Sequence, residues 1–360
     1  MTEKMWAVVK SKRAPGAEIK KVDIPKIGDN EVLVKVRRTS ICGTDVHIWE
    51  WDPWSQEEMK NIPIIFGHEA TGEVVKVGSA VKSVKVGDLV SAETHIADGT
   101  CYQCRTGRMH ICENMKILGV TVNGAFAEYF KIPEINAWKV DPNLEPEIAS
   151  ILEPLGNAVH TALPAGNYED ITGNTVLILG AGPIGLMSIV VAKYLGARKV
   201  IVTEFAEKKV RFELAKKMGA DRVLDAKMDQ KELEEIILSE TDYEGPSVVF
   251  EMSGAPAALE LGLKVITPGG RISLLGIFKG PVSINLNEYV IFKNLRVFGI
   301  TGRRMFDTWY QVSGLLERPE FKKTLKQVIT HIIPIKDIEK GIELIKTAQA
   351  AKVVMEPIWE

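Results

Sequence analysis

The residues best suited to chemistry lie in a segment that contains Cys42 and, further along the chain, the adjacent pair His68 and Glu69. A thiolate, an imidazole and a carboxylate are ligand types that Zn²⁺ takes in open, catalytic sites. The exchangeable fourth position of such a site can accept a substrate hydroxyl, which becomes more acidic there, so that hydride can leave its carbon. Glu69 and Glu153 are both candidate carboxylate ligands, and the residues alone leave the choice between them open.

Thr44 and His47 follow Cys42 closely and suit a hydroxyl–imidazole relay that carries a proton to solvent. Taken alone, a cysteine with a distant histidine is more often structural than catalytic. The Gly-His-Glu step around His68 and a dinucleotide turn later in the chain favour the catalytic interpretation here.

That turn is a Gly-x-Gly-x-x-Gly motif made of Gly180, Gly182, Pro183, Ile184 and Gly185, with Ala181 between the first two glycines. It follows the apolar run 176–179 and precedes an expected helix, which is the context in which this motif binds pyrophosphate. Glu204 ends the next expected strand, where a carboxylate would bind ribose hydroxyls and repel a 2′-phosphate, so NAD is favoured over NADP. Positive charges at residues 208, 209 and 211 act against that preference. The alternative is a glycine-rich turn without a ligand.

A second candidate metal segment contains Asp98, Cys101, Cys104 and Cys112. Three cysteines close together in a protein without a disulfide framework suggest a metal first, and aspartate can complete the set through oxygen. A Cys₃Asp site should bind zinc more weakly than four cysteines, because a carboxylate is the harder ligand. The alternatives are a metal-free loop with reduced thiols or a labile disulfide between Cys101 and Cys104.

Length and composition narrow the class of protein. The chain has 360 residues, which favours two domains, and a formal net charge of −2 gives no reason to expect nucleic-acid or membrane partners. All four cysteines lie in the two candidate metal segments, and the first residues lack the apolar core of a signal peptide. These features predict a cytoplasmic protein with a small-molecule substrate.

Two patterns of secondary structure divide the chain. Short apolar runs at 6–9, 31–36, 72–77 and 87–90 predict an all-β, barrel-like unit, followed by one helix over 145–163. Expected strands at 176–179, 200–203, 222–224, 247–250, 271–275 and 295–298 then alternate with expected helices at 183–195, 208–218, 231–238 and 257–265. Such alternation predicts a doubly wound, mostly parallel sheet inserted into a discontinuous first domain.

The motifs Cys42-Gly-Thr-Asp-x-His47, Gly67-His-Glu69, the cysteine segment, Glu153-Pro-Leu and the glycine turn occur in the order found in the medium-chain zinc-dependent alcohol dehydrogenases. The chain resembles this family from end to end. The resemblance implies an α/β protein with a GroES-like β-barrel catalytic domain at 1–156 and 299–360, and a Rossmann NAD-binding domain at 157–298. It also implies zinc, a nicotinamide cofactor and a homotetramer. Family members carry a fourth cysteine where this chain has Asp98.

Narrower similarities concern the substrate. The segments Glu93-Thr-His95-Ile, Glu153-Pro-Leu-Gly-Asn157 and Gly299-Ile-Thr-Gly-Arg303 resemble those of family members that oxidise the secondary hydroxyl of L-threonine to 2-amino-3-oxobutanoate. The resemblance implies that Cys42, His68, Glu69 and Glu153 surround the catalytic zinc, that Thr44 and His47 form the relay, and that His95 lines the substrate pocket. It implies that Leu275, Ile300, Thr301 and Arg303 contact the nicotinamide half of the cofactor, and that Arg211 contacts the adenosine. The segment 205–211 is slightly longer than the corresponding segment of the family, which counts against Arg211 as an adenosine contact.

Two other functions compete with this interpretation. A sorbitol- or butanediol-type dehydrogenase would use the same chemistry on another alcohol. A non-catalytic binding protein on the same fold usually loses metal ligands, whereas this chain keeps all its catalytic candidates.

Overall fold

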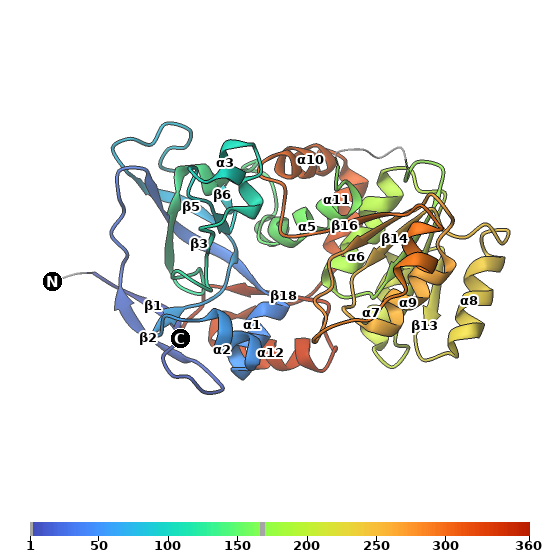
Figure 1. The fold of residues 1–360 in the computed structure, drawn as a ribbon. Helices are drawn as coiled ribbons and strands as arrows, with labels where there is room; N and C mark the ends of the chain where they lie inside the picture. The colour runs from blue at the N-terminus through green and yellow to red at the C-terminus, as the bar shows by residue number, and fades with distance from the viewer. Residues whose placement is uncertain (1–2, 166–169) are drawn as a thin grey trace. The chain divides into compact units, whose positions relative to one another are not determined.

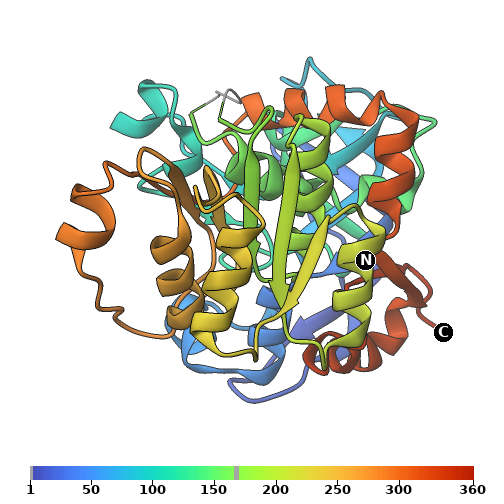
Figure 2. The same cartoon turned by 90° about the vertical axis from the view of Figure 1, so that its right-hand side faces the viewer.

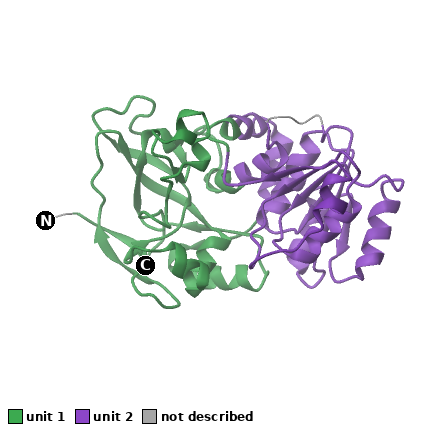
Figure 3. Cartoon of the chain, in the orientation of Figure 1, with its two compact units in different colours: residues 1–154, 304–309, 329–360 green, residues 155–303, 310–328 purple. Residues whose placement is uncertain are grey.

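The fold comes from a computed structural model that describes residues 3–165 and 170–360. The chain forms two compact units (Figure 3). Unit 1 comprises Met1–Pro154, Arg304–Trp309 and Ile329–Glu360, and unit 2 comprises Leu155–Arg303 and Tyr310–Val328. The sequence from 299 onward is therefore divided between the units rather than assigned to one of them.

Unit 1 is built on mostly antiparallel sheets, in which β17 and β18 form a parallel pair. Its largest sheet has the strand order β10 (Ala137–Lys139), β6 (Leu89–Ala92), β5 (Glu69–Val77), β3 (Glu31–Ile41), β18 (Lys352–Glu356) and β17 (Ile329–Pro334), with β9 (Tyr129–Pro133) also paired to β3. A three-stranded sheet contains β2 (Glu18–Asp23), β1 (Lys4–Lys10) and β4 (Ile64–Ile65), and a small ribbon pairs β7 (His95–Ile96) with β8 (Lys116–Ile117). Along β3, Val32, Val34 and Val36 are buried at every second position, as expected of a strand with one core face.

The register of β3 matters for function. Ser40 pairs with Glu69 of β5, and Ile41 pairs with Val353 of β18, so the end of β3 brings together strands far apart in sequence. In Figure 1, β18, near the C-terminal end of the colour scale, lies beside β3 from the N-terminal part. Cys42 follows directly after this end of β3.

The helices of unit 1 are short. They are α1 (Gly43–Glu50), α2 (Pro53–Glu58), α3 (Tyr102–Arg105), α4 (Pro146–Ala149) and α12 (Ile338–Lys346), with 3₁₀ turns at Met109–Ile111, Glu134–Asn136 and Ile335–Asp337. Ile48 of α1 and Ile338 and Ile342 of α12 join one buried apolar cluster with Ile41 of β3. Helix α1 is thereby packed where β3 ends.

Unit 2 contains a six-stranded parallel sheet. Its strand order is β13 (Arg222–Asp225), β12 (Lys199–Glu204), β11 (Thr175–Leu179), β14 (Val248–Glu251), β15 (Arg271–Leu274) and β16 (Arg296–Gly299). All five residues of β11 are buried, which suits the central strand of a sheet covered on both faces. The strand order reverses at β11, and ligands of such sheets bind at this switch point.

Helices connect these strands, and Figure 2 shows them beside the sheet. They are α6 (Pro183–Tyr194), α7 (Lys209–Lys217), α8 (Gln230–Ser239) and α9 (Pro256–Val265), with α11 (Pro319–Lys326) and a π-helical turn at Asn287–Ile291. Helices α5 (Leu152–Ala162) and α10 (Asp307–Leu316) begin in unit 1 and continue into unit 2. The expected doubly wound sheet is confirmed. Among the described residues, no helix is long and apolar enough to cross a membrane.

The single helix expected over 145–163 is wrong. Two helices, α4 and α5, occupy this stretch and are separated at Ser150 and Ile151. Ser150 turns its hydroxyl back to the carbonyl of Glu147 (2.8 Å). The break places Pro154 in the first turn of α5, where a missing backbone N–H leaves no intrahelical bond unmade.

Candidate active site

Cys42, His68 and Glu69 lie together in unit 1. One ligand atom from each of them lies within 4.8 Å of the others, and His68 and Glu69 are buried. Cys42 precedes α1, and its backbone N–H donates to Asp45 Oδ2 (2.8 Å). Asp45 is fully buried, and its other oxygen, Oδ1, lies 3.7 Å from His68 Nδ1. Asp45, which belongs to the Cys-Gly-Thr-Asp segment, therefore contacts both Cys42 and His68.

The electrostatics of this cluster suit a cation. Burial alone would lower the pKa of His68, but the negative charges of Asp45 and Cys42 outweigh burial and raise it to about 10. Burial raises the pKa of Asp45 to about 6, against the opposing effects of His68 and the Cys42 N–H. The surrounding anions favour a proton on this buried imidazole, and they would favour a metal cation in the same place. The donor set of thiolate, imidazole and carboxylate fits zinc.

Glu69 is held by groups that the sequence analysis did not find. Its carboxylate forms a buried ion pair with Lys352 and accepts a hydrogen bond from Ser40 Oγ. Lys352 Nζ also donates to the carbonyl of Ile41 (3.0 Å). Burial would lower the pKa of Lys352, yet the charge of Glu69 raises it overall. Because Lys352 comes from the last strand, only the β3–β18 pairing reveals this counter-charge.

Glu153 lies in the first turn of α5 and is buried. It is outside the group of three close ligand atoms formed by Cys42, His68 and Glu69. Its charge nevertheless contributes to raising the pKa of both His68 and Lys352. Glu153 therefore acts electrically on the cluster without joining the compact triplet.

Thr44 and His47 both lie on α1, three residues apart, so they face the same side of the helix. Thr44 Oγ1 lies 3.8 Å from Cys42 Sγ. His47 is half-exposed, and its Nδ1 lies 2.6 Å from Asp52 Oδ2. Partial burial works against ionisation of Asp52, but hydrogen bonds from Ser55 and His47 hold its pKa below its usual value. Asp52 is a partner of the relay candidate that the sequence analysis missed.

The second metal segment also comes together in unit 1. Ligand atoms of Asp98, Cys101, Cys104 and Cys112 lie within 4.8 Å of one another, and all three cysteines are free thiols. The Sγ atom of Cys101 lies 3.4 Å from that of Cys104 and 3.8 Å from that of Cys112. These distances are too long for a disulfide bond and suit thiols that bind one metal ion together. A donor set of three sulfurs and one carboxylate fits zinc.

Asp98 is exposed but oriented. Its Oδ1 accepts from the backbone N–H groups of Thr100 (2.7 Å) and Cys101 (3.0 Å), and its Oδ2 accepts from Asn114 Nδ2 (2.6 Å). The bond from Asn114 is the largest of the effects that hold the pKa of Asp98 far below its usual value. Asn114 lies just beyond the cysteine pattern, so residue spacing gave no signal for it.

His95 begins β7 and is partly buried. Its backbone N–H donates to Glu93 Oε1 (2.8 Å), and its carbonyl accepts from Asn136 Nδ2 (2.8 Å). The backbone that carries this imidazole is therefore held from both sides.

The glycine turn lies in unit 2, between β11 and α6. Gly180 has a φ of +103°, and a side chain there would also meet Ser253 at 3.0 Å. A Cβ on Gly185 would lie 2.1 Å from the carbonyl oxygen of Gly180, whereas the space around Gly182 is open within 4 Å. Pro183 and Ile184 open α6, whose N-terminus therefore has room for a pyrophosphate.

A cavity of about 250 Å³ lies next to this turn. It is lined by residues that include Gly180, Gly182, Glu204, Lys208 and Arg211. Glu204 is buried and accepts from the N–H groups of Ala181 (3.2 Å) and Phe205 (2.9 Å) and from Lys208 Nζ (3.1 Å). Burial lowers the pKa of Arg211, with the charge of Glu204 opposing that effect.

The other four cofactor candidates lie elsewhere in unit 2 and do not line this cavity. Leu275 follows β15, and Ile300, Thr301 and Arg303 follow β16. Arg303 is buried and donates to Asn157 Oδ1 (3.3 Å), while His160 Nδ1 lies 2.8 Å from the carbonyl oxygen of Gly302. Helix α5 therefore holds the segment after β16, a contact without a signal in the sequence.

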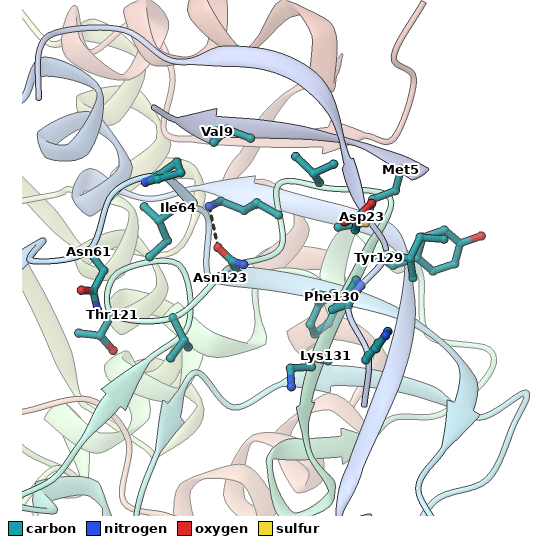
Figure 4. A pocket seen from close by; sticks show the side chains of 18 of the residues that line it. Met5, Val9, Asp23, Asn61, Ile64, Thr121, Asn123, Tyr129, Phe130 and Lys131 are labelled. Atoms are coloured by element: carbon teal, nitrogen blue, oxygen red, sulfur yellow. Dashed lines mark hydrogen bonds between the residues drawn. The ribbon is translucent and has the colours of Figure 1, made fainter. Parts of the chain in front are cut away.

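A cavity of about 1000 Å³ in unit 1 is lined by none of the candidate residues. It lies between β1, β2 and residues 116–131, with Met5, Asp23, Asn123 and Tyr129 among its lining residues (Figure 4). It is larger than the cavity beside the glycine turn, yet no predicted metal ligand or catalytic residue lines it.

A barrel-type unit that carries a close Cys-His-Glu triplet, together with a parallel sheet that carries a dinucleotide turn, defines a zinc-binding dehydrogenase. The family described as "Alcohol dehydrogenase GroES-like domain" matches residues 28–142, and "Zinc-binding dehydrogenase" matches residues 183–318. The chain belongs to this family of zinc-dependent alcohol dehydrogenases.

Relatives narrow the comparison. The chain is 50% identical to L-threonine 3-dehydrogenase of Caldanaerobacter subterraneus subsp. tengcongensis over 353 residues, which is 98% of this chain and 99% of that protein. It is also 50% identical to L-threonine 3-dehydrogenase of Pyrococcus abyssi over 355 residues, again 98% and 99% of the two chains.

Solved structures share the fold at lower identity. A zinc-binding dehydrogenase from Sinorhizobium meliloti bound to NADP has a TM-score of 0.86 and 28% identity over 99% of this chain and 100% of that chain. The 2R,3R-butanediol dehydrogenase from Bacillus subtilis has a TM-score of 0.85 and 28% identity, covering 98% of this chain and 99% of that chain.

Proposed function

We propose that the chain oxidises the secondary hydroxyl of L-threonine to 2-amino-3-oxobutanoate, transferring hydride to NAD⁺ and releasing a proton. The observation that carries this proposal is the 50% identity to L-threonine 3-dehydrogenases over nearly the whole chain. A butanediol dehydrogenase has the same fold but only 28% identity, so the threonine assignment is preferred.

Cys42, His68 and a carboxylate would hold the catalytic zinc. Glu69 is the better placed carboxylate, since it belongs to the close triplet, while Glu153 supplies a second negative charge. Zinc bound there would act as a Lewis acid that lowers the pKa of the substrate hydroxyl. Lys352 balances the charge of Glu69 when that carboxylate is not a ligand.

Thr44 and His47 would remove the hydroxyl proton. Thr44 lies nearest the triplet, and His47 is half-exposed, so a proton passed along α1 reaches solvent at His47. Asp52 would hold the orientation of the His47 ring during transfer, because its Oδ2 lies 2.6 Å from His47 Nδ1.

His95 would line the substrate pocket. The substrate ammonium would be received by Glu153 or another carboxylate, and its carboxylate by Arg303 or backbone amides. Leu275, Ile300, Thr301 and Arg303 would contact the nicotinamide half of the cofactor. These roles derive from the family resemblance and from charge complementarity.

For the cofactor we propose NAD rather than NADP. Glu204 would meet the adenosine ribose at the rim of the cavity beside the glycine turn, where a carboxylate repels a 2′-phosphate. Lys208 and Arg211 line the same cavity and oppose this effect, so the preference is expected to be incomplete. Glu204→Gln should raise the relative kcat/KM for NADP, and an unchanged ratio would remove Glu204 as the discriminating group.

Asp98, Cys101, Cys104 and Cys112 would hold a second, structural zinc. Metal analysis of gently purified protein should then find more than one zinc per chain. A single zinc with full activity would exclude the second site.

We also propose a homotetramer in the cytoplasm. Strand β16 is the edge of its sheet, and Val297, Ile291 and Phe292 are exposed on and beside it, which suits edge-to-edge pairing of two copies. Light scattering at micromolar concentration tests this assembly; Phe292→Asp should yield smaller species, and a monomeric parent protein would refute it.

One experiment tests the reaction itself. NADH formation is measured with L-threonine before and after chelation, with NADP, sorbitol and butanediol as comparisons. Threonine should be turned over fastest, and chelation should abolish the activity. Faster turnover of sorbitol or butanediol would replace threonine as the substrate.

A further inference from the structure

The segment from Glu93 to His95 has an unusually well-anchored backbone. Asn136 is buried, and its side-chain Nδ2 donates to the carbonyls of both Glu93 (2.8 Å) and His95 (2.8 Å). The N–H of Glu93 donates to the Asn136 carbonyl (2.9 Å), and the Thr94 carbonyl accepts from Leu118 (3.0 Å). The backbone that carries His95 thus has little freedom to move.

A buried carboxylate completes this arrangement. Glu93 is fully buried, and its Oε1 accepts from the backbone N–H of His95 (2.8 Å). Its Oε2 accepts from the indole Nε1–H of Trp309 (2.6 Å), a residue 216 positions away along the chain. Glu93 therefore joins the backbone of His95 to the start of α10, and both groups belong to unit 1.

Trp309 is itself fixed by packing. It is buried, and its ring centroid lies 5.6 Å from that of Trp138. Phe306 stacks on Trp138, with an interplanar angle of 12°. The indole N–H consequently points from a rigid aromatic group to a single carboxylate oxygen.

A carboxylate matches these two neighbours. Two N–H donors face its two oxygens, so an isosteric amide could satisfy only one of them and would turn its own NH₂ toward the other. A buried polar conflict of this kind is costly compared with a packing change at the surface.

We propose that Glu93, held by Trp309, is a positioning residue that fixes His95 for the substrate. The proposal rests on the proposed place of His95 in the substrate pocket. Because the backbone is held before the substrate arrives, the direction in which the His95 side chain leaves it is set in advance, which narrows the positions that the imidazole can take. Substrate affinity then depends on the Glu93–Trp309 bond.

Three variants test the bond itself. Glu93→Gln and Trp309→Phe should each raise KM for the substrate by about tenfold, the effect of one lost charge-assisted hydrogen bond. The kcat should change less than KM. The double variant should recover part of the loss of Glu93→Gln, because Phe removes the indole donor that the new amide NH₂ would face. A double variant worse than both single variants, by the product of their effects, would overturn the proposal.

A second cycle tests whether the effect passes through His95. In a His95→Ala background, Glu93→Gln should have almost no further effect on KM, whereas a merely structural role would lower activity equally in both backgrounds. Zinc content and the affinity for NADH, measured by fluorescence, should stay at parental values in Glu93→Gln. Equal KM effects with and without His95 would refute the positioning role.

The design separates this proposal from the proposed substrate. If the parent protein oxidises butanediol faster than threonine, the threonine assignment fails, and the same cycles are measured with butanediol. If His95→Ala leaves KM unchanged for the alcohol that the enzyme does use, His95 is not in the pocket and the positioning proposal fails.

Discussion

The two candidate metal sites of unit 1 are built in opposite ways. Asp98, Cys101, Cys104 and Cys112 come from one short segment, and the carboxylate among them is exposed. Cys42, His68 and Glu69 come from separate segments joined by the pairing of β3 with β5 and β18, and two of them are buried.

The difference is greatest in how charge is balanced. Asp98 is held by backbone N–H groups and by the neutral side chain of Asn114, with solvent close by. Glu69 lies in a water-poor interior, where a full counter-charge from Lys352 accompanies it. A local site can therefore be exposed and simple, whereas a buried reactive site needs support from distant parts of the chain.

The largest expected difference is in activity. Cys42→Ser should reduce kcat/KM by about a thousandfold, because the loss of Lewis-acid assistance removes several kcal/mol of transition-state stabilisation. Cys101→Ser is the matched control in the other site and should keep most of the initial activity. Similar losses in both variants, measured by NADH formation at equal protein concentration, would erase the functional contrast between the sites.

The next effect concerns stability. Lys352→Met should lower the free energy of unfolding of the metal-depleted protein by about 3–5 kcal/mol, since it leaves Glu69 as a buried unpaired charge. Glu69→Gln combined with Lys352→Met should recover much of that loss, as measured by denaturant unfolding. A double variant no more stable than Lys352→Met would show that the pair is not balanced in this way.

A smaller effect is expected at the exposed site. Asn114→Leu removes the hydrogen bond to Asp98 Oδ2 and should speed zinc release about tenfold, as loss of an outer hydrogen bond typically does. Asp98→Cys should slow release, because thiolate is the softer ligand. Release is followed with a chromogenic chelator; if Asn114→Leu releases zinc at the parental rate, Asp98 does not depend on Asn114 for its orientation.

The smallest effect, counted per pH unit, is a pH dependence near α1. Lys10 is buried and donates to the carbonyls of Ala14 (2.6 Å), Gly16 (2.9 Å) and Trp49 (3.2 Å). Burial lowers its pKa from 10.5 to about 8, against the opposing charge of Glu50. Below pH 8 the amine is charged in both folded and unfolded chains, and its burial then costs stability in full.

As pH rises from about 8 to 10.5, the folded chain releases this proton before the unfolded chain does, so the cost is relieved and stability increases. Relative to Lys10→Met, the parental free energy of unfolding should rise by about 1 kcal/mol per pH unit over this range. The exposed Lys12→Met serves as the control for the loss of one charge. Parallel pH profiles for the parent and Lys10→Met would contradict the prediction.

Much of the fold could be predicted because its signals are local. The buried runs of the parallel sheet and the glycine turn before α6 follow from apolar patterning and from backbone requirements at Gly180. The break between α4 and α5 had a local signal, because Pro154 is disfavoured in the interior of a long helix. Only the structure places the break at Ser150, whose hydroxyl bonds back to Glu147.

The candidate sites show the same limit. Residue types and neighbouring motifs identified Cys42 and His68 as metal candidates, and short spacing identified the cysteine segment. The structure brings each group together. The partners that balance or orient them, such as Asp52, Asn114 and Lys352, were missed. Charged and amide side chains occur all over the surface, so nothing in their type marks which of them turns toward a site.

The sequence by itself determined the ligand chemistry of this protein, since thiol, imidazole, carboxylate and glycine turn are properties of residues and their neighbours. Only the tertiary structure decided which groups accompany them: Lys352 beside Glu69 and Trp309 beside Glu93. The physical reason is that burying a charge or a polar group is costly unless a partner meets it, and that partner is supplied by strand pairing and packing over long sequence distances.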